Sequence, residues 1–153
     1  MSITIQTETW HPFIDEIQPM LPLHWEELAL NRDKVPLDPR YDMYEVLDAQ
    51  NALLVVSIRD NGVVRGYFIG IVNAHMHYSS QVVLAMDIFW LHPDIRGKGM
   101  LGVKLFREVE NEAKRRGVHT LLFGSKLHKD ASRLFDFLKM KPIETYYSKW
   151  IGD

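Results

Sequence analysis

The 153-residue sequence contains no cysteine, which excludes disulfides, thiolate metal ligands and a thiol nucleophile. It also lacks a run of about 20 apolar residues, the length of a membrane span, and it opens with no basic-then-apolar signal segment. The formal net charge is only −2, which argues against general nucleic-acid binding. We therefore expect a cytoplasmic protein with neither a membrane nor a nucleic acid as its partner.

Charge is nonetheless distributed unevenly along the chain. Residues 1–50 carry three basic and ten acidic side chains, a net −7, whereas residues 96–153 carry thirteen basic and seven acidic ones, a net +6. A basic C-terminal part suits a phosphate-rich ligand and an acidic N-terminal part suits a cationic one, although surface charge also fluctuates along any chain. With 46% hydrophobic residues, residues 1–153 are expected to form one domain with its own core.

Hydrophobic periodicity and turn residues predict alternating strands and helices. The expected strands span residues 3–8, 52–59, 63–74, 81–91, 118–124 and 142–150. The expected helices lie within residues 12–30, where two prolines interrupt the pattern, and over residues 41–50, 101–116 and 129–138. Asp60-Asn61-Gly62 predicts a tight hairpin, and the strand after the 101–116 helix is expected to pair in parallel with the 81–91 strand.

The most informative stretch joins the 81–91 strand to the 101–116 helix. It contains Arg96, Gly97, Lys98, Gly99, Met100, Leu101 and Gly102 in succession. Glycines let backbone N–H groups approach a ligand closely, and the N-terminus of the helix adds partial positive charge. The Arg96 and Lys98 side chains add full charges. The stretch therefore predicts an anion site, for which a diphosphate is the natural ligand.

Two other glycine-loop patterns fit this stretch less well. The phosphate-loop pattern ends in Gly-Lys-Ser/Thr, but Met100 follows Gly99. Gly97, Gly99 and Gly102 match the string Gly-x-Gly-x-x-Gly of dinucleotide-binding folds. That fingerprint needs a strand–helix–strand unit, whereas the segments before the loop predict an antiparallel meander. A glycine match alone is weak, so the context of the loop decides.

Arg96-Gly97-Lys98-Gly99, preceded by an apolar strand and His92-Pro93, resembles the pyrophosphate motif of the GCN5-related N-acetyltransferases (GNAT). The family signature is Gln/Arg-x-x-Gly-x-Gly/Ala; Arg96 and Gly99 match it, whereas Leu101 stands at its sixth position. The resemblance covers residues 52–151. It implies a mixed α/β (α+β) fold, with a mainly antiparallel central sheet, a V-shaped splay between two strands and helices on both faces. The C-terminal stretch Lys139-Met140-Lys141-Pro142 of this sequence is similar to that of phage-encoded family members, and a bacterial source is also compatible.

The resemblance implies acetyl-CoA as the cosubstrate. The pantetheine arm would enter the splay and pair, like an added strand, with backbone groups of the 81–91 strand. A backbone N–H there would also stabilise the oxyanion of the thioester carbonyl. The residues implied at the pantetheine arm are Phe89, Trp90 and Leu91, and those at the pyrophosphate are Arg96, Gly97, Lys98, Gly99, Met100, Leu101 and Gly102.

Amine acetylation needs a group that accepts a proton, because the ammonium form of the amine cannot attack. Asp87 is the only carboxylate in residues 63–91, and its apolar neighbours favour burial, so it is the candidate general base. An exposed Asp at a strand edge or bulge is the alternative. In the family a tyrosine of the last helix often protonates the leaving thiolate, but Phe135 stands at that position. The candidates to replace it are His128, Tyr147, Tyr146 and water.

The resulting hypothesis is an acetyl-CoA-dependent N-acetyltransferase that moves the acetyl group to a primary amine by direct attack in a ternary complex. The acceptor is a small molecule or a protein amine, and a homodimer is compatible with the family. The resemblance implies that Trp25, Tyr41, Asp42 and Tyr44 lie near the acceptor, although ordinary helix packing explains these residues equally well. The alternative is an acyl-CoA-binding regulatory or interaction module with little activity, which Phe135 motivates. No metal site is expected, because His75 and His77 lack a third ligand.

Overall fold

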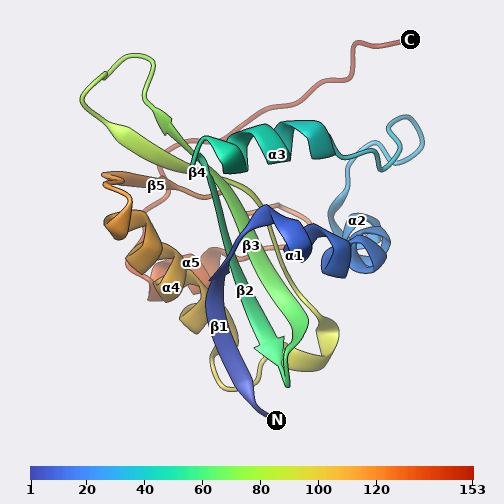
Figure 1. Ribbon diagram of the computed structural model, residues 1–153. Helices are drawn as coiled ribbons and strands as arrows, with labels where there is room; N and C mark the ends of the chain where they lie inside the picture. The colour runs from blue at the N-terminus through green and yellow to red at the C-terminus, as the bar shows by residue number, and fades with distance from the viewer.

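The computed structural model describes residues 1–153 and consists of a five-stranded sheet with helices on both faces (Figure 1). The strands are β1 (Ile3–Glu8), β2 (Leu53–Asp60), β3 (Val63–Ala74), β4 (Val82–Leu91) and β5 (Thr120–Leu122). The helices are α1 (Trp10–Ile17), α2 (Leu21–Leu28), α3 (Tyr41–Ala49), α4 (Leu101–Arg115) and α5 (Ser132–Phe137), with short 3-10 turns η1 (Gln18–Met20) and η2 (Pro93–Ile95). None of the helices has the length and apolarity needed to cross a membrane.

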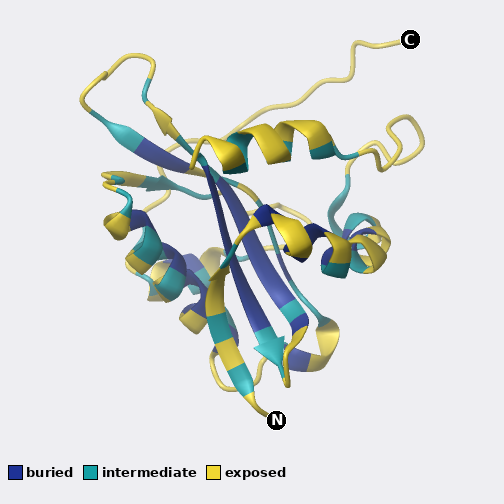
Figure 2. Cartoon of the chain, viewed as in Figure 1, coloured by how far each residue is buried: buried dark blue, intermediate teal, exposed yellow.

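The order of strands in the sheet is β1-β2-β3-β4-β5. The first four strands are antiparallel neighbours, and β5 lies parallel to β4 after the crossover helix α4. Side chains of the central strands alternate between two cores. Leu105 of α4 packs with Phe68 on one face, and Phe13 of α1 packs with Val55 and Tyr67 on the other. Figure 2 shows the buried middle of the sheet between these layers. The predicted fold class is confirmed.

The strands β4 and β5 lie side by side only where both begin. Their register contains three pairs, Val83 with Thr120, Leu84 with Leu121 and Ala85 with Leu122. β5 ends at Leu122, opposite Ala85, and the C-terminal half of β4 has no strand on this side. The sheet is therefore open at the place of the expected V-shaped splay, and this opening, called the splay below, leaves backbone groups of β4 available for a ligand.

A β-bulge interrupts β4 close to the start of the splay. The pairing of β3 with β4 shifts between Ile69 and Gly70, which leaves Asp87 as the extra residue of β4. Gly70 is required opposite the bulge, because an added Cβ would lie only 2.7 Å from a side-chain carbon of Leu84. The alternation of β4 side chains between the two faces of the sheet therefore changes phase at this bulge.

The predicted strand over residues 142–150 is wrong. Residues 139–153 contain no helix or strand, and the side chains of Ile143 and Tyr147 are 72% and 94% exposed. An alternating pattern forms a strand only when a neighbouring strand bonds its backbone, and the outer edge of the short β5 carries none. The segment instead runs towards the loop before α3, where Lys34 Nζ lies 5.3 Å from the centre of the Trp150 ring (Figure 1).

Candidate active site

The β4–α4 loop presents backbone amides at the N-terminus of a helix. Gly97, Gly99 and Met100 have φ values of 71°, 54° and 54°, and all three residues are exposed. Glycine adopts this left-handed conformation without strain, which explains two of the three residues. The N–H groups of Gly99, Met100, Gly102 and Val103 donate no hydrogen bond within the chain, and no side chain caps α4. Met100, Gly102 and Val103 line a cavity of about 300 Å³. The loop thus has free donors for an anion.

Arg96 lines this cavity, but its guanidinium group is already paired within the chain. Its Nε donates to the carbonyl oxygen of Leu91 at 2.8 Å, and its Nη2 donates to Glu27 Oε1 on α2 at 2.6 Å. The guanidinium carbon lies 5.9 Å from the centre of the Trp90 ring. Arg96 therefore ties the end of β4 and the loop to α2, and the exposed Lys98 is the cation left free at the loop.

Glu27 is the acceptor that holds this arrangement together. Besides Arg96, its carboxylate accepts from Trp90 Nε1 at 3.3 Å and from Lys129 Nζ, in the loop before α5, at 3.1 Å. Burial alone would raise the pKa of Glu27, but these three donors outweigh it and lower the pKa to about 2. The charged carboxylate consequently links α2 to β4 and its loop through Trp90 and Arg96, and to the loop before α5 through Lys129.

The backbone of β4 alternates in direction, which decides which of its groups face the splay. The carbonyl oxygen of Trp90 faces β3, where an added Cβ on Gly66 would lie 3.1 Å from it. The carbonyl oxygen of Leu91 faces the other side, where Arg96 Nε reaches it. Phe89, two residues before Leu91, faces the same side. Contrary to its implied role, the Trp90 backbone is therefore not placed to pair in the splay, whereas Phe89 and the Leu91 N–H are.

Asp87, the candidate base, is exposed rather than buried, and as the extra residue of the β-bulge it has no partner on β3. The Tyr44 hydroxyl of α3 donates a hydrogen bond to Asp87 Oδ2. The Tyr44 ring stacks on Trp10, with 4.7 Å between the ring centres. Burial, and then the neighbouring Asp87 carboxylate, raise the pKa of Tyr44, so its hydroxyl stays protonated and remains a donor. The carboxylate is thus fixed by one donor and open to a ligand on its other oxygen.

The residues named as proton donors lie in exposed segments. His128 is in the exposed loop before α5, Tyr147 is in the exposed C-terminal segment, and no hydrogen bond joins either to Asp87. Phe135 is buried, with its ring centre 5.4 Å from that of Phe106 and 6.4 Å from that of Phe89. The position of the usual tyrosine is therefore part of an apolar cluster, and the assignment of the acid stays a prediction.

Sequence analysis missed the two pairs that organise this site. Glu27 and Arg96 are 69 positions apart, and Tyr44 and Asp87 are 43 apart, so no local spacing signals either pair. The acidic character of residues 1–50 is the only trace of them in the sequence. No group of three or more His, Cys, Asp or Glu side chains is arranged to hold a metal ion.

The sequence matches the profile of the acetyltransferase (GNAT) family over residues 17–137. The chain belongs to this family. Among solved structures of the same fold is an aminoglycoside acetyltransferase from an uncultured soil metagenomic sample, with a TM-score of 0.77, 12% identity and coverage of 99% of this chain and 100% of that one. Glucosamine-6-phosphate N-acetyltransferase from Arabidopsis thaliana has a TM-score of 0.73, 11% identity and coverage of 99% and 100%. A predicted acetyltransferase from Clostridium acetobutylicum, solved with acetyl-CoA, has a TM-score of 0.68, 13% identity and coverage of 98% and 97%. No curated protein matches the sequence.

Membership of the GNAT family decides between the glycine-loop alternatives. The phosphate-loop and dinucleotide patterns belong to parallel-sheet folds, whereas this GNAT chain has an antiparallel meander before its loop. The loop that the sequence predicts to be the GNAT motif lies between β4 and α4, next to the β4–β5 splay.

Proposed function

We propose that this protein is an N-acetyltransferase that moves the acetyl group of acetyl-CoA to a primary amine by direct attack in a ternary complex. The observation that carries the proposal is the group of unpaired N–H donors at Gly99, Met100 and Gly102, next to the unpaired half of β4. Free amides at a helix N-terminus bind phosphate groups, and a free strand edge binds an extended chain that contains amides. Coenzyme A carries a pyrophosphate and a pantetheine arm in succession, so it suits both features.

The residues at these two places fit that cosubstrate. The loop amides and Lys98 would hold the pyrophosphate, and Phe89 with the Leu91 N–H would pair with the pantetheine arm. An N–H of β4 near the bulge would stabilise the oxyanion as the amine attacks. Bound acetyl-CoA supplies the acetyl group as an activated thioester.

Asp87 is proposed to take the proton that the amine must lose. As the C–N bond forms and the C–S bond breaks, one proton passes from the amine nitrogen to Asp87, and the leaving thiolate takes one from water, His128 or Tyr147. Tyr44 keeps the Asp87 carboxylate in place through its hydrogen bond. Because Asp87 is exposed, it can return its proton to solvent after each turnover.

Release of thiol from acetyl-CoA, measured with a panel of small amines, amino sugars and peptides, tests the proposal. Wild-type protein is expected to turn over with at least one acceptor, and Asp87→Asn is expected to lower kcat by roughly 100-fold. Asp153→Asn removes one carboxylate at the chain end and is the control with unchanged kcat. Binding of acetyl-CoA without acetylation of any amine would contradict the proposal and favour a CoA-binding module.

A further inference from the structure

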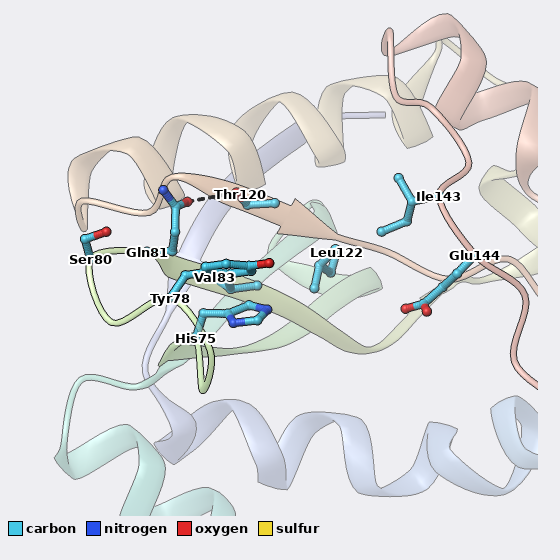
Figure 3. Close-up of a pocket in the computed structure, with 9 residues that line it drawn as sticks. All are labelled: His75, Tyr78, Ser80, Gln81, Val83, Thr120, Leu122, Ile143 and Glu144. Carbon is cyan, nitrogen blue, oxygen red and sulfur yellow. Dashed lines mark hydrogen bonds between the residues drawn. The ribbon is translucent and has the colours of Figure 1, made fainter.

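A second cavity, of about 470 Å³, lies at the other end of β4 from the glycine-rich loop. Its floor is formed by Val83 and Leu122, one wall by His75 and Tyr78 of the β3–β4 connection, and the opposite wall by the C-terminal segment. Figure 3 shows the carboxylate of Glu144 pointing from that segment into the cavity. The volume is within the range of small-molecule sites.

The wall at the β3–β4 connection is built before any ligand binds. The N–H of His75 donates to the carbonyl oxygen of Gln81 at 2.9 Å, and the N–H of Gln81 donates to that of Tyr78 at 2.8 Å. The His75 and Tyr78 rings lie against each other, with 4.9 Å between their centres (Figure 3). Because backbone hydrogen bonds already shape this wall, a ligand binds there without a large cost for ordering the connection.

The cavity shares a face of the sheet with Asp87. Leu84 and Leu121 pack into the core beneath α4, so their neighbours Val83 and Leu122 point to the opposite face. Asp87 contacts Tyr44 of α3, which covers that same opposite face. Val83 and Asp87 are four residues apart on β4, which corresponds to about 13 Å along the strand. Leu122, at the floor of the cavity, pairs with Ala85, and this is the last residue pair of β4 and β5 before the splay.

Building on the proposed transferase activity, we infer that this cavity binds the distal part of an extended acceptor that carries a second positive charge. The reacting amine lies at Asp87, the carbon body lies over Val83 and Leu122, and the second ammonium group pairs with Glu144. None of the nine lining residues is a lysine or an arginine, so no resident cation competes for Glu144.

A series of α,ω-diamines of increasing length, each compared with the monoamine of the same carbon chain, tests this inference. For long chains the wild-type protein is expected to show a KM about tenfold lower for the diamine than for the monoamine, with similar kcat. Glu144→Gln is expected to remove this difference by raising the KM of the diamine alone. Glu110→Gln, on α4 at the other face of the sheet, removes the same charge elsewhere and is expected to keep the difference.

Equal KM values for diamine and monoamine in the wild type, or a difference that survives Glu144→Gln, would overturn the inference while leaving the transferase function intact. Calorimetric titration of the diamines in the presence of CoA gives the same comparison without turnover. Tighter binding of the long diamine that depends on Glu144 would support the inference about the cavity even if no amine is acetylated. The absence of acetylation would then contradict the proposed transferase activity and not the cavity.

Discussion

The Tyr44 hydroxyl donates a hydrogen bond to Asp87 across the space between α3 and the β4 bulge. Tyr44→Phe removes this donor but keeps the ring that stacks on Trp10. We expect kcat to fall by about tenfold, since a hydrogen bond to a charged group contributes roughly 1.5 kcal/mol or more. An unchanged kcat would contradict the role of Tyr44 in positioning the Asp87 carboxylate.

Neutralisation of Arg96 and Lys129 by Glu27 limits the positive charge near the loop. Glu27→Gln should therefore strengthen CoA binding by about fivefold at low salt, which corresponds to ~1 kcal/mol, and should steepen its salt dependence. Glu26→Gln breaks only the exposed pair with Arg32 and is the matched neighbouring control. Titration calorimetry at two salt concentrations measures both effects, and equal affinities for Glu27→Gln and the wild type would contradict this account of the loop.

His24 of α2 is buried and shares a hydrogen bond of 2.7 Å with the Tyr67 hydroxyl. Burial lowers the pKa of His24 from 6.5 to about 4. The unfolded chain therefore binds the proton more readily, and stability that is present above pH 6.5 is lost as the pH falls towards 4. The free energy of unfolding in urea should decrease by about 2 kcal/mol between pH 7 and pH 5.

The pKa of Glu27, about 2, places its own contribution to pH dependence below this window. His24→Gln, which cannot titrate, should lower stability at pH 7 but flatten the dependence between pH 7 and pH 5. The same slope in the variant and the wild type would assign the effect to other groups.

The parts of the fold that the sequence predicts are those that local chemistry decides. Asn61 and Gly62 adopt φ values of 50° and 82°, the left-handed pair that a two-residue hairpin needs and that these residue types favour. Gly117, with φ of 75°, follows α4 at the expected stop. The strand after α4 is parallel to β4 because a crossover helix leaves no other simple arrangement.

The parts that the sequence does not predict depend on distant partners. Apolar neighbours along the chain suggested burial of Asp87, but it is the unpaired residue of the bulge and its side chain is exposed on the face covered by α3. The basic character of Arg96 is visible in the sequence, whereas the carboxylate that neutralises it lies on α2. The alternation over residues 142–150 lacks a strand to pair with, so its apolar side chains stay exposed.

Calorimetric titration of acetyl-CoA against the wild type, Gly99→Glu and Gly117→Glu tests the central claim, that backbone amides at the start of α4 hold the pyrophosphate. Gly99 and Gly117 both have positive φ, and both have open space around an added Cβ, so the two variants carry the same strain and charge at opposite ends of one helix. We predict that Gly99→Glu weakens acetyl-CoA binding by at least about 100-fold, whereas Gly117→Glu leaves it within about twofold of the wild type. Equal binding by wild type and Gly99→Glu would contradict the account.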